Sequence, residues 1–426
     1  MVGLREQHTA AESEQNMTGG SPFRLFLVFT VAALCCSSEA KSDGKLKIFI
    51  LAGQSNMVGH ARAHTIATLL ASEAERDQQL VHMVFGADSD VSLSMLNEQL
   101  RRGQKIDELT GGISGDKLKA MEPGDEKTKR EAEVEQLKAA HEAYKASVAA
   151  ACAVSDRVYI TSIADRNRKS GPLSIGYGAD DKKIGPEYAF GLSMAAQVEG
   201  PVLLIKTSWG GKSLHYNFRP PSAGAYELSD KEQAGDKAAE IKQNTGLNYR
   251  LMNEAIHAAL DHLDDCHPDY DPQQGYEIAG FVWFQGFNDQ FSPAFRDNDK
   301  DNMVTFIKDI RREYNVPELP FVIGVLGTPV TAEKIAENAV SVGQRAAAQT
   351  PEFAGNVTAV ESYLHYSHYS NAVFQKGWPA HYHEWDTVGS DRPYHYLGSG
   401  AFFVRLGDAF ADAMAELMSA RSSAGR

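Results

Sequence analysis

The segment GQSNM places a serine between two amide side chains at the end of an apolar stretch. Ser55 lies between Gln54 and Asn56, shortly after the apolar run that begins at Lys47. A simple turn needs only Gly or Asn. A hydroxyl held among amide and backbone N–H donors suits attack on a carbonyl, because the oxyanion that forms must be stabilised. Ser55 is therefore the candidate nucleophile.

Two further apolar segments end in glycine-containing turns that carry polar side chains. In doubly wound α/β sheets, ligands lie beyond the carboxyl ends of the strands, so we expect these turns to meet Ser55. Glycine lets the backbone approach a substrate closely, and a neutral amide supplies an oxyanion donor. The two turns contain Gly210, Gly211, Lys212 and Ser213 after PVLLIKTSW, and Gln285, Gly286, Phe287, Asn288 and Asp289 after IAGFVWF.

His395, in the late segment GSDRPYHYLGSGAFF, is the candidate general base. A histidine before the last helix is able to fold back over the strand ends and accept the proton of Ser55. Asp391 precedes His395 by four residues. Since a nearby carboxylate orients the imidazole and stabilises its cation, Asp391 is the candidate acid.

Short apolar segments alternate with amphipathic helical patterns through the rest of the chain. This alternation predicts a parallel sheet with helices on both faces, in one α/β domain over residues 41–426. Besides the strand before Ser55, strands are expected within 157–164, 200–211, 276–289, 319–327 and 356–362. Helices are expected within 65–77, 185–199, 247–265, 302–314, 332–349 and 398–421.

A charged section from about residue 97 to 154 interrupts this alternation. It is rich in Ala, Glu and Lys with charges of alternating sign. This pattern predicts an exposed helical insertion, which has either a purely structural role or that of a lid over part of the site.

The N-terminal segment, the net charge and the cysteines indicate where the protein is located and which partners are excluded. Within residues 1–40, a basic residue, Arg24, precedes an apolar run too short to span a membrane, and the segment closes on Ser-Glu-Ala, a pattern typical of a secretory signal peptide. A secreted or periplasmic protein, with no membrane anchor after cleavage, is the expectation. The formal net charge of -14 argues against a nucleic-acid partner. Cys152 and Cys266 remain after cleavage, either as a disulfide or as buried thiols.

The motifs ILAGQSNMVGHA, IKTSWGGKSL, WFQGFND and YHYLGSGA together resemble those of the SGNH-hydrolase superfamily. Within it, the chain is most similar to sialate O-acetylesterase-like enzymes, the family 6 carbohydrate esterases. The resemblance covers residues from about 47 to the end, apart from the charged section. It implies a flavodoxin-like three-layer α/β/α sandwich that hydrolyses acetyl esters of carbohydrates, without a metal or organic cofactor.

The resemblance also implies roles for individual residues. Ser55 corresponds to the nucleophile and His395 to the base. The oxyanion hole corresponds to the backbone N–H groups of Ser55 and Gly211 together with one amide side chain. That amide is Gln285 by the pattern of the carbohydrate esterases and Asn288 by that of the wider superfamily, and both stay open here. Residues expected to contact the substrate are Gln54, Trp209 and Lys212.

The acid departs from the pattern of the superfamily. Its usual place is three residues before the histidine, where this chain has Arg392, and Asp391 is one residue further away. Either the loop bulges to bring Asp391 to His395, or the acid is Glu384 or Asp386.

Two other functions stay open from the residues alone. A carbohydrate-binding protein on the same fold, without catalysis, follows if the acid is missing. A metal-dependent phosphodiesterase follows if the histidines of the segment 365–383 bind a metal. Their spacing is compatible with such a site. These histidines are His365, His368, His381 and His383.

Overall fold

The structure, a computed structural model, describes residues 44–164, 167–328 and 331–424. The chain divides into two units, residues 1–41 and 42–426, and only the second contains described residues. The predicted signal peptide therefore lies outside the described residues. None of the described helices is long and apolar enough to cross a lipid bilayer.

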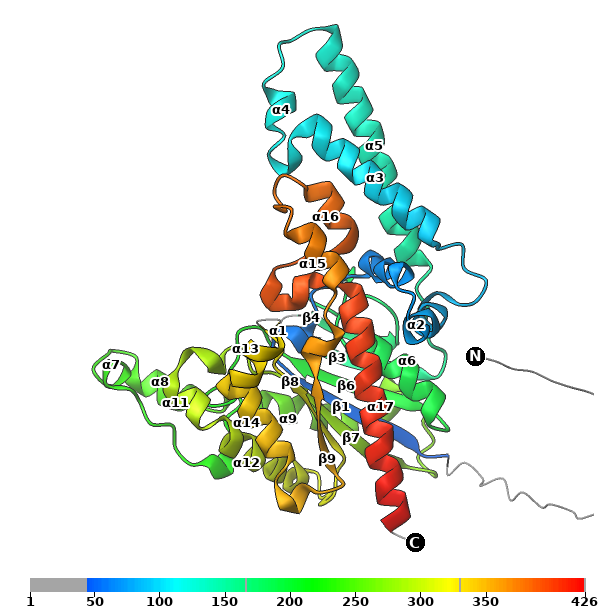
Figure 1. The fold of residues 1–426 in the computed structure, drawn as a ribbon. Helices are drawn as coiled ribbons and strands as arrows, with labels where there is room; N and C mark the ends of the chain where they lie inside the picture. Colours follow the sequence, from blue (N-terminus) through cyan, green and yellow to red (C-terminus); the bar gives the residue numbers. More distant parts are fainter. Residues whose placement is uncertain (1–43, 165–166, 329–330, 425–426) are drawn as a thin grey trace, which may run out of the picture. The chain divides into compact units, whose positions relative to one another are not determined.

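Within the described residues, a sheet of seven strands forms the centre of the fold (Figure 1). Its order is β4-β3-β6-β1-β7-β8-β9, and all neighbouring strands are parallel except β3 and β4. The strands are β1 (Leu46–Gly53), β3 (Val158–Ala164), β4 (Asn167–Pro172), β6 (Val202–Ser208), β7 (Tyr276–Phe284), β8 (Phe321–Val325) and β9 (Val357–Glu361). The chain fills one side of β1 with β3 and β6 and then the other with β7 to β9. The topological switch point, where ligands bind in such sheets, therefore lies at β1.

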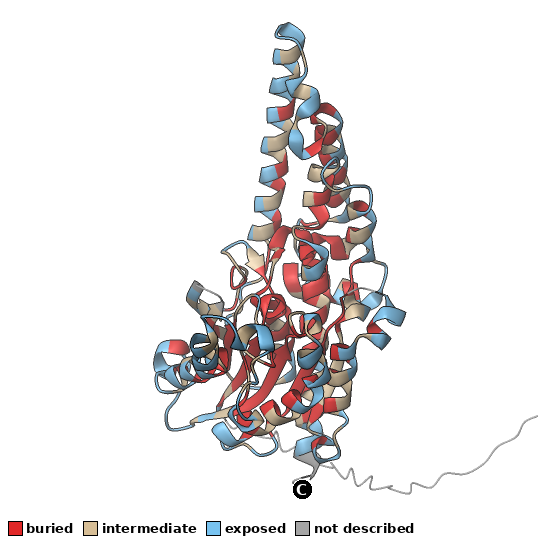
Figure 2. Cartoon of the chain, turned by 90° about the vertical axis from the view of Figure 1, so that its left-hand side faces the viewer, coloured by how far each residue is buried: buried red, intermediate tan, exposed pale blue. Residues whose placement is uncertain are grey.

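Alternate residues of β1 enter two separate cores, as the pleat of a strand dictates. Phe49 and Leu51 belong to one core, and the even-numbered residues from Leu46 to Ala52 belong to the other. Figure 2 shows the buried residues concentrated in the sheet and in the helices against it. The first core is covered by α2 (Glu75–Phe85), α6 (Glu187–Gln197), α17 (Gly400–Ala424) and a 3-10 helix (Ala63–Ala71). The second is covered by α9 (Leu247–Leu260), α10 (Leu263–Cys266), α12 (Asp299–Glu313) and α14 (Ala339–Ala348).

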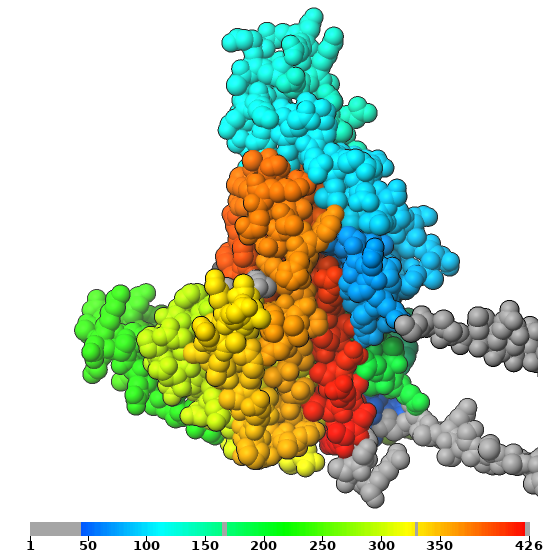
Figure 3. Space-filling model, in the orientation of Figure 1, coloured from blue at the N-terminus to red at the C-terminus, as the bar shows by residue number. Residues whose placement is uncertain are grey.

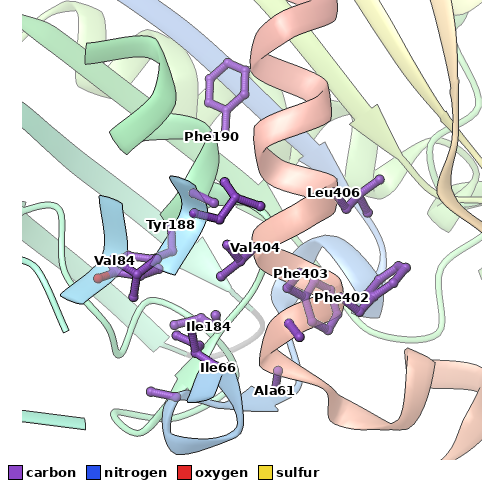
Figure 4. Close-up of a cluster of buried hydrophobic side chains, with 14 of the residues drawn as sticks. Ala61, Ile66, Val84, Ile184, Tyr188, Phe190, Phe402, Phe403, Val404 and Leu406 are labelled. Carbon is purple, nitrogen blue, oxygen red and sulfur yellow. The ribbon is translucent and has the colours of Figure 1, made fainter. Parts of the chain in front are cut away.

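The C-terminal helix α17 joins several elements of the first core (Figure 4). Its Val404 points toward Tyr188 of α6, and Ile184 of the short strand β5 (Lys183–Ile184) lies on the same side of the helix, while Phe402 lies on the opposite side. β5 pairs in antiparallel orientation with β2 (Ala61–Arg62), just beyond the GQSNM turn. The outer side of α17 reaches the surface, beside the yellow and orange segments in Figure 3. This helix thus supports the region around Ser55 from one face.

The charged section folds into α3 (Leu93–Thr110), α4 (Asp116–Lys119) and α5 (Asp125–Ala150). α3 packs against α5 and against α16 (Tyr382–Val388), which follows α15 (His368–Phe374) (Figure 1). That this section is an insertion remains a prediction. The remaining short helices are α1 (Ser55–Val58), α7 (Asp230–Gln233), α8 (Ala238–Asn244), α11 (Pro293–Asp297) and α13 (Ala332–Glu337).

The predicted α/β fold class is confirmed, and each predicted strand and helix has a counterpart. The predicted helix over 65–77 is divided between a 3-10 helix that ends at Ala71 and α2, which begins at Glu75. The antiparallel edge strand β4 was not predicted. Its sequence, NRKSGP, is polar and ends in proline, a composition found at sheet edges and hard to distinguish from a loop.

A buried ion pair fixes the chain just after Ser55. Lys206 of β6 and Glu187 of α6 are both fully buried, with Nζ 2.8 Å from Oε2. The Lys206 ammonium also donates to the backbone oxygens of Val58, at 2.9 Å, and Tyr177, at 2.8 Å. Its three protons therefore have three acceptors. Because Val58 ends α1, this pair ties the turn that contains Ser55 to the sheet.

We expect Lys206→Met to lower the free energy of unfolding by about 3–5 kcal/mol, since it leaves the carboxylate of Glu187 buried without its cation. Urea denaturation measures this change. The control is Lys308→Met, which breaks an exposed pair with Glu352 and should cost under about 1 kcal/mol. Adding Glu187→Leu to Lys206→Met should restore part of the loss. Equal losses from Lys206→Met and Lys308→Met would contradict the role of the buried pair.

The buried His64 should make stability depend on pH. Its Nε2 lies 2.6 Å from the backbone oxygen of Asp386, and burial lowers its pKa to about 4. Between that value and about 6.5, the unfolded chain binds a proton that the folded chain does not, so the free energy of unfolding falls as pH falls. We expect His64→Gln to flatten this slope by on the order of 3 kcal/mol across the window, measured by urea denaturation at several pH values. The exposed His82, changed to Gln, should leave the slope as it is.

Candidate active site

Ser55 follows the central strand β1 directly and begins α1. It is largely buried, with 8% of its surface exposed. The turn before it requires glycine, because a Cβ at Gly53 would lie 2.1 Å from the backbone oxygen of Phe284. The backbone N–H of Trp209 donates to the oxygen of Gly53 at 3.2 Å. The ends of β1, β6 and β7 therefore meet at Ser55.

Gln54 connects these strand ends through its side-chain amide. It is 1% exposed. Its Oε1 accepts from the backbone N–H groups of Gly286, at 3.2 Å, and Asn288, at 3.3 Å. Its Nε2 donates to Oδ1 of Asn288 at 3.1 Å and lies 3.5 Å from Oγ of Ser55. Its polar atoms are thus bonded to protein groups around the nucleophile.

The two candidate oxyanion amides differ in their surroundings. Gln285 is 3% exposed, and its Nε2 already contacts Oε1 of Gln54 at 3.2 Å, the oxygen of Lys212 at 3.0 Å and a carboxylate oxygen of Asp289. Asn288 is half-buried, and its Oδ1 accepts from Gln54. Among the described residues, Nδ2 of Asn288 has no hydrogen-bond acceptor, so it is available to a ligand.

Asp289 joins the turn after β7 to the turn after β6. Its carboxylate is fully buried and accepts from the backbone N–H groups of Leu214 and His215, each at 2.9 Å. Burial raises the pKa of Asp289 to about 6. Because this side chain is committed to backbone donors, it acts as a connection between the two turns.

The turn after β6 also carries Gly211, Trp209 and Lys212. Gly211 is exposed and has a φ of 68°, which favours glycine. Trp209 and Lys212 are half-buried. Trp209 borders a cavity of about 580 Å³, whose lining also includes Thr161 and Lys169. The rest of its lining comes from β3, β4, α9 and α10, so of the candidate site residues only Trp209 borders this cavity.

His395 and Asp391 are in contact despite their unusual spacing. Nδ1 of His395 lies 3.1 Å from Oδ1 of Asp391. The loop closes on itself, because the N–H groups of Ser390 and Asp391 donate to the oxygen of Leu397 at 2.8 and 3.1 Å. Tyr396 and Leu397 have φ values of 50° and 65°. This left-handed turn accommodates the one additional residue between Asp391 and His395. The loop therefore bulges and brings Asp391 to His395, which was one of the two expectations from the sequence.

The strained turn is held in place by Tyr396. Left-handed backbone at a residue other than glycine costs of order 1–3 kcal/mol and persists only where the surroundings enforce it. The ring of Tyr396 is fully buried and stacks on Phe402 of α17, with centroids 3.9 Å apart. Its hydroxyl bonds the N–H of Gly327 and Oγ of Ser362, each at 2.9 Å. The loop that carries His395 is thereby anchored to α17 and to the ends of β8 and β9.

The same loop contacts the turn that contains Ser55. Nδ2 of Asn56 donates to the backbone oxygen of Tyr394 at 3.2 Å. His60, which the sequence analysis did not single out, stacks on His395 with ring centroids 4.0 Å apart. Its Nδ1 lies 3.3 Å from Oδ2 of Asp391. Burial opposes ionisation of Asp391, but hydrogen bonds from His395 and His60 hold the pKa of that carboxyl well below its usual range.

The other two candidate acids are engaged elsewhere. Glu384 accepts from Nε2 of Gln104 at 2.8 Å and pairs with Lys376. Asp386 pairs with Lys145 at 2.7 Å and lies 3.1 Å from Nε2 of His141. Among the described residues, Asp391 is the carboxylate that contacts His395.

The histidines of the segment 365–383 do not form a metal cluster within the described residues. Nδ1 of His383 lies 2.8 Å from Oδ1 of Asp107, and Nδ1 of His381 lies 3.4 Å from Oε2 of Glu384. Each of these two histidines thus has its own carboxylate partner. The two cysteines, Cys152 and Cys266, are buried free thiols, which decides between the two expectations for them.

Three solved structures are similar to this chain at low identity. A protein of Arabidopsis thaliana is 13% identical with a TM-score of 0.41, and the match covers 87% of this chain and 98% of that one. A carbohydrate acetylesterase from Xanthomonas citri is 11% identical with a TM-score of 0.39. That match covers 86% of this chain but spans 55% of the Xanthomonas protein. NanS is 10% identical with a TM-score of 0.35, covering 75% and 78% of the two chains.

No curated protein matches the sequence. The model of one family, described as carbohydrate esterase, sialic acid-specific acetylesterase, matches residues 132–375, which is more than half of the chain. The matched range contains the turns after β6 and β7, while Ser55 and His395 lie outside it. The chain belongs to this family of carbohydrate esterases and is a carboxylic ester hydrolase.

Proposed function

We propose that this chain is a secreted serine esterase that removes acetyl groups from carbohydrates through an acetyl-enzyme. The observation that carries the mechanism is the contact of 3.1 Å between His395 and Asp391, in a loop bonded to the Ser55 turn. Secretion is proposed from the pattern of residues 1–40. The choice of a carbohydrate substrate rests on the family.

In the proposed reaction, His395 takes the proton of Ser55 as its Oγ attacks the acetyl carbonyl carbon. Asp391 orients the imidazole and stabilises its positive charge. The tetrahedral intermediate collapses, and His395 passes the proton to the oxygen of the departing sugar. Water then attacks the acetyl-enzyme with His395 again as base, which releases acetate and restores Ser55.

The oxyanion hole is proposed to comprise the backbone N–H groups of Ser55 and Gly211 and the side-chain Nδ2 of Asn288. Gln285 is the weaker candidate because three acceptors already surround its Nε2. Gln54 fixes Oδ1 of Asn288 and so sets the direction of Nδ2. A donor that is oriented before the reaction needs no rearrangement when charge develops. We therefore assign Gln54 to positioning, and keep Trp209 and Lys212 as the residues expected to contact the sugar.

We expect Ser55→Ala to abolish hydrolysis of 4-nitrophenyl acetate while circular dichroism and the unfolding midpoint stay close to wild type. A serine-reactive inhibitor should block the wild-type enzyme, and a chelator should not. The same comparison is then made with acetylated xylan and O-acetylated sialic acid by measuring acetate release. Wild-type turnover by Ser55→Ala would disprove the mechanism, and loss of activity to the chelator alone would favour metal chemistry.

We expect Asn288→Ala to lower kcat by roughly 10²–10³, the usual cost of losing one oxyanion donor. KM should change little, because the donor acts mainly on the charge that develops in the transition state. Gln290→Ala, in the same turn, is the matched control and should retain kcat. An unchanged kcat in Asn288→Ala, together with a large loss in a folded Gln285→Ala, would move the donor to Gln285.

A further inference from the structure

The proposed triad leaves one imidazole at the site without a role. His60 lies five residues after Ser55, beyond the end of α1. Its Nδ1 is 3.3 Å from Oδ2 of Asp391, while Nδ1 of His395 is 3.1 Å from Oδ1 of the same carboxylate. The three side chains are 14–19% exposed. Asp391 therefore faces the Nδ1 atoms of two largely buried imidazoles.

We infer that His60 is a positioning residue for catalysis, which holds Asp391 in the orientation that His395 requires. This inference rests on the proposed serine mechanism and extends it. His60 is not a member of the proposed triad or of the oxyanion hole, and it acts through the carboxylate.

The position of Asp391 explains why a second imidazole is needed. Asp391 precedes His395 by four residues, on a loop closed by left-handed backbone. Its Oδ1 is bound by His395 and by the N–H of Arg392, at 2.7 Å. Within the described chain, His60 is the partner of Oδ2. Without it, one oxygen has no fixed partner and the carboxylate is free to rotate away from His395.

The stacked rings require His60 to be neutral when His395 accepts a proton. The two rings are nearly parallel, at 11°, and their centroids are 4.0 Å apart. A charged His60 would repel the imidazolium of His395 at this distance. Burial lowers the pKa of His60, with further contributions from His395 and Lys183, and the hydrogen bond and charge of Asp391 oppose this. A neutral His60 has one N–H, and the inference places it on Nδ1, 3.3 Å from Oδ2 of Asp391.

This arrangement predicts a shift in the pH profile when the donor is removed. The contact with His60 keeps the negative charge of Asp391 beside Nδ1 of His395. Without His60, the carboxylate rotates away from His395 more often and stabilises its imidazolium less. The acid limb of kcat/KM then moves to lower pH.

The experiment compares variants of His60 by their pH profiles with 4-nitrophenyl acetate. His60→Phe keeps a flat ring against His395 but has no N–H. We expect about a tenfold loss of kcat, the scale of one hydrogen bond to a charged group, with KM nearly unchanged and the acid limb at lower pH. His60→Asn places an amide N–H near the position of Nδ1 and should recover most of kcat and the wild-type limb. His82→Phe, at an exposed position, is the control.

The outcomes separate this inference from a structural role. An unchanged kcat and acid limb in His60→Phe overturns it. A second pattern also overturns the inference: kcat falls in His60→Phe, the acid limb stays as in wild type, and His60→Asn does not restore kcat. That pattern indicates that His60 acts through packing alone. If His60→Phe does not fold, His60→Asn and His60→Leu, which match in size, make the same comparison, and equal kcat values overturn the inference.

Ser55→Ala is measured beside these variants. If it retains turnover, the serine mechanism fails and the role of His60 fails with it. If it is inactive and the variants of His60 behave like wild type, only the inference about His60 fails.

Discussion

The site depends on one constraint. The backbone groups beyond the buried ends of β1, β6 and β7 need hydrogen-bond partners, because the sheet does not continue there. A buried N–H without an acceptor costs free energy comparable to a lost hydrogen bond. Gln54 meets this need with one amide, whose Oε1 accepts from Gly286 and Asn288. Asp289 does the same for Leu214 and His215. The groups that satisfy the strand ends are thus the same groups that aim the side chains around Ser55.

A second layer of polar contacts lies beneath this one and serves a different purpose. Lys206 and Glu187 are fully buried and hold Val58 at the end of α1. Buried polar networks are strong when every group is bonded and costly when one is missing. The pair therefore restrains the chain on the far side of Ser55, as Gln54 does on the near side. Between them, the serine has little freedom to change its backbone conformation.

The fold class could be predicted from the sequence because it leaves a local pattern, and Ser55 stays the predicted nucleophile for the same kind of reason. Apolar strands alternate with amphipathic helices, and Ser55 stands in a short motif. Lys206 and Glu187 were not predicted, since a lysine within a strand and a glutamate at the start of a helix are ordinary in isolation. Only the packing of α6 on the sheet brings them together. The edge strand β4 was not predicted for a related reason, because its polar residues carry no signal of pairing.

The unusual spacing of the candidate acid, Asp391, is compensated by contacts with distant parts of the chain. The spacing of four between Asp391 and His395 left the acid open among three carboxylates, because loop conformation is not encoded in spacing alone. A left-handed turn at Tyr396 and Leu397 brings Asp391 to His395, and its strain is balanced by burial of Tyr396 against Phe402. Such a turn fixes the backbone of Asp391 but leaves its carboxylate free to rotate about the side-chain bonds.

The carboxylate of Asp391 then requires a partner from outside the loop, and this partner must come from an element already fixed next to the loop. The chain after α1 is such an element, because Lys206 restrains Val58 and Asn56 bonds to Tyr394. The place of His60 is thus a consequence of the same anchoring that holds Ser55.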